Sequence, residues 1–377
     1  MRFKTLVLLM LFSFAAMAGE VKSSVVYGLI TAALENDTNY LQQHFEEVYA
    51  DFGKGEVAEH KLLDNYLAFA NAHPDLAEAL DAWVDEYPES GHAYITRGVY
   101  HHAVALQYRG QNDDGSPKSD VNVTENLEKA VKDIIVATGL YEDYALPYGF
   151  LISVHATSGS RAAMQQAMRK GLEIDPASYT VRSSYLDALH PEQGGNFSDM
   201  SSFITKGLAY EKSNPDLKML RGYLHAAAAK LQGEANKSEE VVSLSSQAEK
   251  LGLSAQGLHM VGVAYFHAGE FDSAWNALEK SRRNSPGLMA NYFWKGRLLA
   301  SQKKYDDAIY WYDQALALNP VDTKVLLWKS KVLVALQEFE GAASAYQTIL
   351  SFCGAGNQKI SVGYEILLSH SRTASLD

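Results

Sequence analysis

Hydrophobic residues recur at helical spacing in the last third of the chain, and polar residues fill the positions between them. Leu258, Val261, Gly262 and Tyr265 follow the spacing i, i+3, i+4 and i+7, which places them on one face of a helix. Gly269 is expected to end this helix, because glycine is a common stop signal at helix ends. The pattern predicts an amphipathic helix with a small residue in the middle of its apolar face.

A second helix is predicted directly after the first. It runs from about Asp272 to Arg283 and carries Ala274 and Leu278 on its apolar face. It should stop before Pro286, since proline disfavours helical geometry in the residue before it. One such pair cannot bury its apolar faces alone, so neighbouring pairs must stack on one another.

The same residue types return when this stretch is shifted by 34 positions. A small residue, an aromatic residue and an alanine coincide three times, and a proline closes the first two units. The aligned sets are Gly262, Gly296 and Ser330; Phe271, Tyr305 and Phe339; Ala274, Ala308 and Ala342; and Pro286 with Pro320.

This pattern resembles the tetratricopeptide repeat (TPR), whose 34-residue units each form two antiparallel helices. The match is fullest in the second unit, which reads YFWKGRLLASQKKYDDAIYWYDQALALNP. The resemblance implies an all-α, right-handed superhelical solenoid of antiparallel helix pairs, with repeats at 255–288, 289–322 and 323–356. A C-terminal capping helix is expected in QKISVGYEILLSHSR. The resemblance also implies a protein that binds other proteins.

Apolar stripes without a repeat period predict four short helices between Val25 and Tyr87. Pro88 should end the last of them. The stripe of that helix consists of Leu76, Leu80, Trp83, Val84 and Tyr87. This segment is expected to form a helical N-terminal cap or subdomain.

Degenerate helix pairs are predicted between this segment and the clear repeats. The first pair is split by the polar insertion RGQNDDGSPKSDVNV, after which Thr124 is expected to be an N-cap. A better unit spans Ala145 to Pro176, and a stretched unit broken by HPEQGGNF follows it. We therefore expect a helical N-terminal domain with degenerate repeats at 19–215 and a TPR solenoid at 216–377.

Residues from about 71 to 200 also resemble an uncharacterised bacterial domain family that precedes TPRs. The matching stretches are HPDLAEALDAWVDEYPES, RGVYHHAVALQYRG and LHPEQGGNFSDM. Gln193 and Asn196 stand where that family has tryptophan and serine. The family has no established activity, so this resemblance implies no chemistry.

The first 18 residues have the order of a secretory signal peptide. Arg2 and Lys4 precede an apolar run that is too short to span a bilayer, and Ala16-Met17-Ala18 is a small-residue cleavage site. We expect residues 1–18 to be removed on export, to the periplasm in preference to secretion. No later segment is apolar and long enough for a membrane helix, so no membrane insertion of the mature form is expected.

The chain is acidic, with a formal net charge of −12 at pH 7. Of its 33 basic residues, Arg2 and Lys4 would leave with the signal, so that 31 would face 45 acidic ones. Such a protein repels phosphate backbones, which disfavours nucleic acid as a partner. Cys353 is the single cysteine and cannot form an internal disulfide. It fits a partly buried small hydrophobe better than an intermolecular disulfide.

No catalytic, metal or cofactor motif is present in the sequence. Serine-hydrolase, zinc-protease and dinucleotide signatures are absent. His101 and His102 are adjacent on a predicted helix and point about 100° apart, so they cannot share an ion from one turn. The insertion resembles a calcium loop only weakly, because Gly110 and Val121 stand where the first and last carboxylates should be. We expect no enzyme, no metal and no cofactor.

The remaining candidate site is the inner wall of the solenoid. The TPR resemblance places the groove on the first helix of each unit, where aromatic residues alternate with cations. The candidate residues are His259, Val263, Phe266, Phe293, Trp294, Arg297, Lys324, Leu327, Trp328 and Lys331. They suit an extended peptide with apolar anchors and some negative charge. The same side chains would also suit ordinary packing against a neighbouring helix.

The sequence thus predicts an exported scaffold for protein or peptide ligands. The alternative is an enzyme or a small-ligand protein whose site lies in the N-terminal half. That site would lie around Trp83, Tyr94, His101, His102 and Tyr108. A pocket with convergent polar groups would favour this alternative.

Overall fold

The N-terminal segment forms four short helices, as its apolar stripes predict. The computed structural model describes residues 24–109, 121–353, 363–365 and 367, and these contain no strand. The four helices are α2 (Val25–Leu34), α3 (Thr38–Gly53), α4 (Glu59–Leu67) and α5 (Leu76–Glu86). The carboxylate of Asp37 accepts a hydrogen bond from the Tyr40 amide at 3.0 Å and so caps the start of α3.

Helix pairs make up most of the rest of the described chain. The first helix of each pair contacts the first helix of a neighbouring pair along much of the array. The pairs are α6 (Gly91–Tyr108) with α7 (Val121–Leu140), α8 (Leu146–Thr157) with α9 (Arg161–Ile174), α10 (Tyr179–Ala188) with α11 (Phe197–Leu208), α12 (Tyr223–Glu234) with α13 (Ser238–Leu251), α14 (Ala255–His267) with α15 (Phe271–Asn284), α16 (Met289–Ser301) with α17 (Tyr305–Leu318), and α18 (Thr323–Ala335) with α19 (Phe339–Cys353). Two 3₁₀ helices, η1 (Pro191–Gln193) and η2 (Pro215–Leu220), interrupt the middle of the array.

The small residues of the 34-residue pattern lie where two helices meet, as predicted. A Cβ atom on Gly262 would come within 2.7 Å of the Leu278 side chain, and one on Gly296 within 2.6 Å of the Tyr312 ring. Glycine is therefore required at both positions for close helix approach. Ala274, Ala308 and Ala342 are each 0% exposed. The second helix of the first clear unit ends two residues before Pro286, which confirms the predicted stop.

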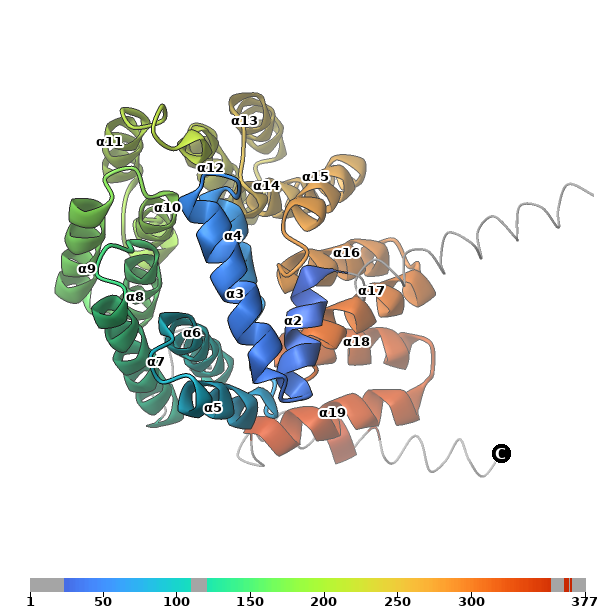
Figure 1. The fold of residues 1–377 in the computed structure, drawn as a ribbon. Coiled ribbons are helices and arrows are strands. Elements are labelled where there is room, and N and C mark those ends of the chain that lie inside the picture. The colour runs from blue at the N-terminus through green and yellow to red at the C-terminus, as the bar shows by residue number, and fades with distance from the viewer. Residues whose placement is uncertain (1–23, 110–120, 354–362, 366, 368–377) are drawn as a thin grey trace, which may run out of the picture.

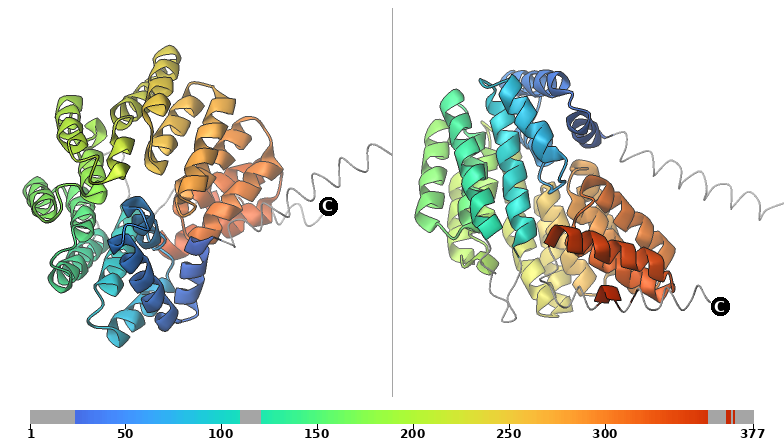
Figure 2. Two further views of the ribbon diagram at one scale, coloured as in Figure 1. Left: turned by 45° about the horizontal axis from the view of Figure 1, so that its top comes forward. Right: turned by 90° about the horizontal axis from the view of Figure 1, so that it is seen from below.

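The array curves until its two ends meet. Figure 1 shows α5 to α19 arranged as a ring, with α3 and α4 lying across its opening. Figure 2 shows that α2 and α3 lie at one face of this ring. Gln107, at the end of α6, donates a hydrogen bond to the Val321 carbonyl before α18 at 2.8 Å. The superhelix is therefore closed by contact between its first and last pairs.

The helices α2, α3 and α4, here called the brace, bind the ring through a buried carboxylate. Glu59 is 4% exposed and accepts hydrogen bonds from the Ser178 hydroxyl at 2.8 Å and from the Tyr179 and Thr180 amides at 2.6 and 2.9 Å. The Asn214 side chain donates a fourth bond at 2.7 Å. Glu59 thus caps the N-terminus of α10, where the helix dipole favours negative charge.

Two further polar contacts extend this attachment along the ring. His60 donates its backbone amide to Asp216 at 3.0 Å, and its ring Nδ1 lies 2.9 Å from the same carboxylate. The Ser285 hydroxyl donates to Asp64 at 2.8 Å. Residues in the first two turns of α4 therefore reach three of the loops that connect successive helix pairs.

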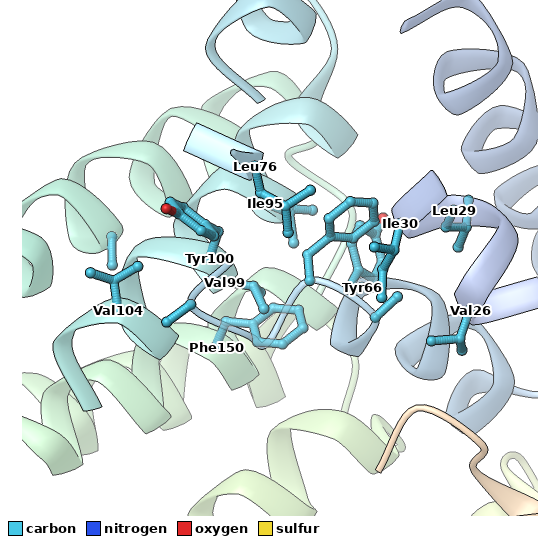
Figure 3. Close-up of a cluster of buried hydrophobic side chains, with 14 of the residues drawn as sticks. Val26, Leu29, Ile30, Tyr66, Leu76, Ile95, Val99, Tyr100, Val104 and Phe150 are labelled. Carbon is cyan, nitrogen blue, oxygen red and sulfur yellow. The ribbon is translucent and has the colours of Figure 1, made fainter. Parts of the chain in front are cut away.

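Apolar packing joins the brace to the pairs at both ends of the array. The largest hydrophobic cluster combines residues of the brace and of α5 to α8 with residues of α16 to α18. Figure 3 shows its N-terminal part, where Tyr66 of α4 lies among side chains of α2 and α6. The residues labelled there are Val26, Leu29, Ile30, Tyr66, Leu76, Ile95, Val99, Tyr100, Val104 and Phe150. A second cluster lies in the middle of the array, from Ala177 to Leu298.

One boundary predicted from the sequence is wrong. Thr124 lies inside α7, which already begins at Val121 in the described chain, so it is not the N-cap. Asn122 and Val123 are already helical, because the apolar stripe of α7 begins at Val123, within the stretch that the sequence assigns to the polar insertion. The expected signal peptide, the insertion from 110 to 120 and the side chain of Cys353 lie outside the described residues. Of the expected capping helix, residues 363–365 and 367 are described and are helical, and Leu367 is buried against Leu333 and Ala342.

Candidate binding groove

The candidate groove residues lie on α14, α16 and α18, the first helices of the three clear units. Six are half-buried, two cations are exposed, and Val263 and Phe293 are each 2% exposed. The half-buried residues are His259, Phe266, Trp294, Arg297, Leu327 and Trp328, and the exposed cations are Lys324 and Lys331. These are the first helices of three consecutive pairs, so the side chains on them can form one continuous surface.

Arg297 lies at the centre of this surface. Its guanidinium carbon is 3.4 Å from the ring centre of Trp328 and 5.2 Å from that of Trp294. Phe266 and Phe293 lie at 5.6 and 5.9 Å from it. These distances are in the range where the negative face of an aromatic ring attracts a cation. The aromatic rings hold Arg297 through their faces, so its N–H groups can still donate hydrogen bonds to a ligand.

Two lysines extend the same surface on α18. Lys324 Nζ lies 4.8 Å from the Phe293 ring centre, and Lys331 Nζ lies 4.1 Å from that of Trp328. We call Phe266, Phe293, Trp294, Arg297, Lys324, Trp328 and Lys331 the cation–aromatic strip. Within the described part of the chain, none of its three cations forms an ion pair. The strip is therefore a positive surface on an acidic protein.

A directed chain of hydrogen bonds fixes His259 beside the strip. The Ser281 hydroxyl donates to the Ala255 carbonyl at 2.6 Å and therefore accepts from the Asn291 amide at 2.8 Å. The Asn291 oxygen then accepts from His259 Nδ1 at 2.9 Å. Burial lowers the pKa of His259 to about 4. The imidazole is therefore neutral near pH 7, with its proton on Nδ1 and an acceptor lone pair on Nε2.

The structure brings the predicted groove residues together on three neighbouring first helices. Three of them pack against other side chains and present little free surface to a ligand. Phe293 is so buried that it supports Trp294 and Lys324 instead of presenting a free face, and Val263 is core. Leu327 packs at the edge of a small cluster with Leu326 and belongs less to the strip than to the core of the last pair. The groove assignment itself stays a prediction for every residue.

A buried ion pair lies directly behind the strip, and no sequence pattern predicts it. Lys295 is 0% exposed, and its Nζ lies 3.8 Å from the ring centres of both Trp275 and Trp311. Nζ also donates to Glu279 at 2.5 Å, and Arg282 donates to the same carboxylate at 2.7 Å. Burial lowers the pKa of Lys295 to about 8. Burial acts to raise the pKa of Glu279, but its bonds to Arg282 and Lys295 outweigh this and lower it to about 2.

The residues proposed for an alternative site in the N-terminal half serve separate structural contacts. Trp83 is fully buried and donates its ring N–H to Gln42 at 3.1 Å. His101 contacts Asn126 of α7 at 3.2 Å, whereas His102 contacts Thr157 of α8 at 2.8 Å. The two histidines therefore point to different helices, as their adjacency predicts. Among the described residues, no group of three or more His, Cys, Asp or Glu is arranged to hold a metal ion.

Family comparisons agree with the pattern of the sequence. Residues 260–323 match the model of the tetratricopeptide repeat. This confirms the TPR prediction. Residues 37–120 match a domain of unknown function, DUF4034, which confirms the resemblance of the N-terminal region to an uncharacterised family. This match begins and ends earlier than the expected stretch from about 71 to 200. No curated protein matches the chain.

The solved structure of yeast Tom70 shows the same type of fold. Yeast Tom70 is similar over 82% of this chain and 64% of its own, with a TM-score of 0.51 and 13% identity. A chain of the APC/C hetero-tetramer Cut9-Hcn1 is similar over 82% of this chain, with a TM-score of 0.44 and 10% identity. This protein spans 56% of the length of that chain. At such identities the likeness concerns the fold, which is an all-helical TPR-type solenoid.

No helix in the described ranges combines the length and the apolar character that a membrane span requires.

Proposed function

We propose that this protein is a scaffold that binds an extended peptide segment of a partner protein along the cation–aromatic strip. The observation that carries the proposal is Arg297, which is held by four aromatic rings and has no carboxylate partner among the described residues. A partner carboxylate would complete this site, because guanidinium and carboxylate groups form paired hydrogen bonds. Half-buried Trp294 and Trp328 offer flat apolar surfaces on either side for the anchors of the same peptide.

Two features of the surroundings support this proposal. His259 offers one hydrogen-bond acceptor at a fixed orientation, which suits a peptide N–H group. The buried Lys295 pair holds α15, α16 and α17 together behind the strip, so the strip lies on a rigid support. Rigid placement reduces the entropy that binding must overcome.

The proposal includes export, which rests on the sequence of residues 1–18 alone. Arg2, Lys4, the apolar run and Ala16-Met17-Ala18 support removal of this segment. N-terminal sequencing of the protein from its native compartment should begin at Gly19. A protein that keeps Met1 and stays in the cytoplasm would contradict this part of the proposal and leave peptide binding untouched.

Peptide selection tests the binding proposal directly, because it needs no natural partner protein. A displayed library of random dodecapeptides is selected on the folded protein, and the affinity of the recovered peptides is measured by fluorescence anisotropy. We expect enrichment of Asp or Glu next to aromatic or aliphatic residues. The double variant Trp294→Ala, Trp328→Ala should weaken binding by about 2 kcal/mol or more. Replacement of the exposed brace residue Tyr40 by alanine is the matched control and should leave the affinity unchanged.

Charge variants separate the two components of recognition. Lys324→Gln with Lys331→Gln should mainly slow association and reduce its salt dependence, because peripheral charges steer encounters more than they hold complexes. Selected peptides without acidic residues, or full affinity in the folded double tryptophan variant, would show that the strip is not the binding site. The search would then move to the region of His101 and the loop after Pro191.

A further inference from the structure

The third helix pair, α10 with α11, departs from the repeat geometry. In the other pairs the two helices pack along their length, but α11 contacts α10 only sparsely. The chain between them, from His190 to Asn196, replaces a short turn by η1 and two glycines. Gly194 adopts a φ of 80°, and a Cβ atom on Gly195 would lie 1.9 Å from the Leu189 carbonyl oxygen. Glycine is required at both positions, and the loop that they allow moves α11 away from its partner.

Arg182 holds α11 in this displaced position. The residue is 4% exposed, and its guanidinium donates to the Pro176 carbonyl from Nε and Nη2 at 3.1 and 2.6 Å. The same group lies 5.5 Å from the ring of Phe203 in α11 and 5.3 Å from the ring of Tyr210, two residues after the end of that helix. The separation of α10 and α11 is therefore built into the core and does not depend on the surface loop alone.

A cavity of about 400 Å³ fills the space that this separation opens. Its two long walls come from α9 and α11, and each contributes residues at i, i+3, i+4 and i+7 of one helical face. The α9 wall consists of Arg161, Met164, Gln165 and Met168, and the α11 wall of Asp199, Ser202, Phe203 and Lys206. Two facing helix surfaces of this kind would normally pack on each other, and here they enclose a space large enough for a small organic molecule.

The interior and the rim of this cavity differ in polarity. Met164 and Tyr185 are 6% and 8% exposed and form an apolar floor together with Phe203, whose ring lies 4.9 Å from that of Tyr185. Arg161 and Lys206 are exposed at the rim, and neither forms an ion pair among the described residues. Arg161 uses one N–H group for the Gly194 carbonyl at 2.7 Å.

The single carboxylate of the lining is already engaged. Asp199 accepts from the Asn196 side chain at 2.8 Å, and its own amide donates to the Asn196 oxygen at 2.8 Å. His155, at the end of α8, has a pKa lowered by burial and adds no full charge near pH 7. The balance at the rim is therefore positive, above an apolar floor.

We infer that this cavity, here called the outer cavity, is a binding site for a small organic anion with an aromatic or branched aliphatic body. The apolar floor accepts the body, and Arg161 and Lys206 attract the anionic group. This site is separate from the cation–aromatic strip, because it lies between the second helices α9 and α11 of the degenerate units. The protein thus carries a small-molecule site beside its peptide surface.

Anilinonaphthalene sulfonate is a suitable probe, because it is an aromatic anion whose fluorescence rises in apolar surroundings. We expect the mature protein to bind one equivalent of this probe saturably at the outer cavity. The double variant Arg161→Glu, Lys206→Glu should weaken this binding about tenfold or more, since two attractive charges become repulsive. The control Arg169→Glu, Lys170→Glu changes the same charges at exposed positions of α9 outside the lining and should stay within about twofold.

Two further measurements locate the probe. Phenylnaphthylamine, the uncharged analogue, should bind both charge variants alike, which shows that the cavity persists. Ser202→Trp should fill the cavity and abolish the binding of one equivalent of either probe. Circular dichroism checks that this variant is folded. Equal weakening in the Arg169, Lys170 control would reveal unspecific charge attraction and overturn the inference. Undiminished binding of both probes to the Ser202→Trp variant would place their site elsewhere and overturn it as well.

Discussion

The brace and the C-terminal repeats are both made of short amphipathic helices, but different interactions hold them in place. In the repeats, small residues such as Gly296 and Ala308 allow helices adjacent in sequence to pack closely. In the brace, polar side chains reach across the molecule. Glu59 binds Ser178, which lies 119 residues away, and Asp64 binds Ser285, which lies 221 residues away. Local packing thus forms each repeat, whereas the brace is attached to the curved array by long-range polar contacts in addition to the apolar cluster that it shares with α16 to α18.

The brace should also raise the cooperativity with which the array unfolds. A repeat array gains stability from nearest-neighbour contacts, so its ends can open separately. The brace contacts the start of α10, η2 and the loop before α16, and thereby connects repeats that do not touch each other. We therefore expect the closed ring to unfold more cooperatively than an open array of the same pairs.

Loss of the Glu59 carboxylate should have the largest effect. Glu59→Ala leaves three buried donors and the half-buried Asn214 amide without this acceptor and should cost about 3–5 kcal/mol of unfolding free energy. Hydrogen exchange should show that α2 to α4 lose protection before the C-terminal repeats do. Glu59→Gln keeps one oxygen that accepts two of the four hydrogen bonds, but its NH2 group faces the other two donors, so an intermediate loss is expected. An unchanged unfolding free energy in both variants would show that the carboxylate does not anchor the brace.

Acid should weaken the repeats through Glu279. Its folded pKa of about 2 lies below the unfolded value of 4.5, so its stabilisation is present above pH 4.5 and is lost as the pH falls toward 2. Glu279→Gln should cost about 2–3 kcal/mol near neutral pH, and this difference should shrink by about 2 kcal/mol between pH 6 and pH 3. Urea unfolding at several pH values measures the difference. The exposed Glu240→Gln variant is the control and should show no such pH dependence.

Overpacking one helix contact tests the register of the repeats. Ala308→Leu should cost about 1–3 kcal/mol, because the site between α16 and α17 is 0% exposed and has no room for extra atoms. The same substitution at the exposed Ala317 of α17 should change stability little. A denaturation midpoint that is equally unaffected in both variants would contradict the close contact at Ala308.

Ring closure should contribute the smallest measurable amount. Gln107→Ala removes one hydrogen bond to the Val321 carbonyl and should cost about 1 kcal/mol. Protection of the amides around Val321 and at the end of α6 should fall together in hydrogen exchange. The exposed Gln247→Ala variant serves as the control. A loss of protection limited to α6 would mean that the two ends do not stabilise each other.

Periodic residues explain why the repeats could be predicted from the sequence. Gly262, Gly296 and the three alanines recur because each helix pair repeats one contact, and the structure places all of them at such contacts. The four N-terminal helices were also predicted, since each carries its own apolar stripe. Their position over the ring could not be predicted, because Glu59 and its partners form a single contact that leaves no period in the sequence.

The candidate sites show the same division between repeated and single contacts. Aromatic and cationic residues of the strip could be proposed because the repeat register places them on successive first helices. The burial of Phe293 depends on contacts with Trp294 and with Tyr312 of the next helix. The pair formed by Lys295 and Glu279 depends on the neighbouring Trp275 and Trp311, which no local pattern connects. The outer cavity likewise depends on the separation of α10 and α11. The glycines of that loop were visible in the sequence, but the displaced helix was not.

Site-specific photocrosslinking tests the central claim that the repeats bind the partner while the brace only supports the ring. A p-benzoylphenylalanine residue replaces the exposed Lys331 of α18 in one variant and the exposed Tyr40 of α3 in another. Each is irradiated with the peptide selected on the unmodified protein, and the crosslinked fraction is measured by mass spectrometry. The account predicts a peptide crosslink from position 331 and none from position 40. Crosslinking from position 40 without crosslinking from position 331 would contradict it.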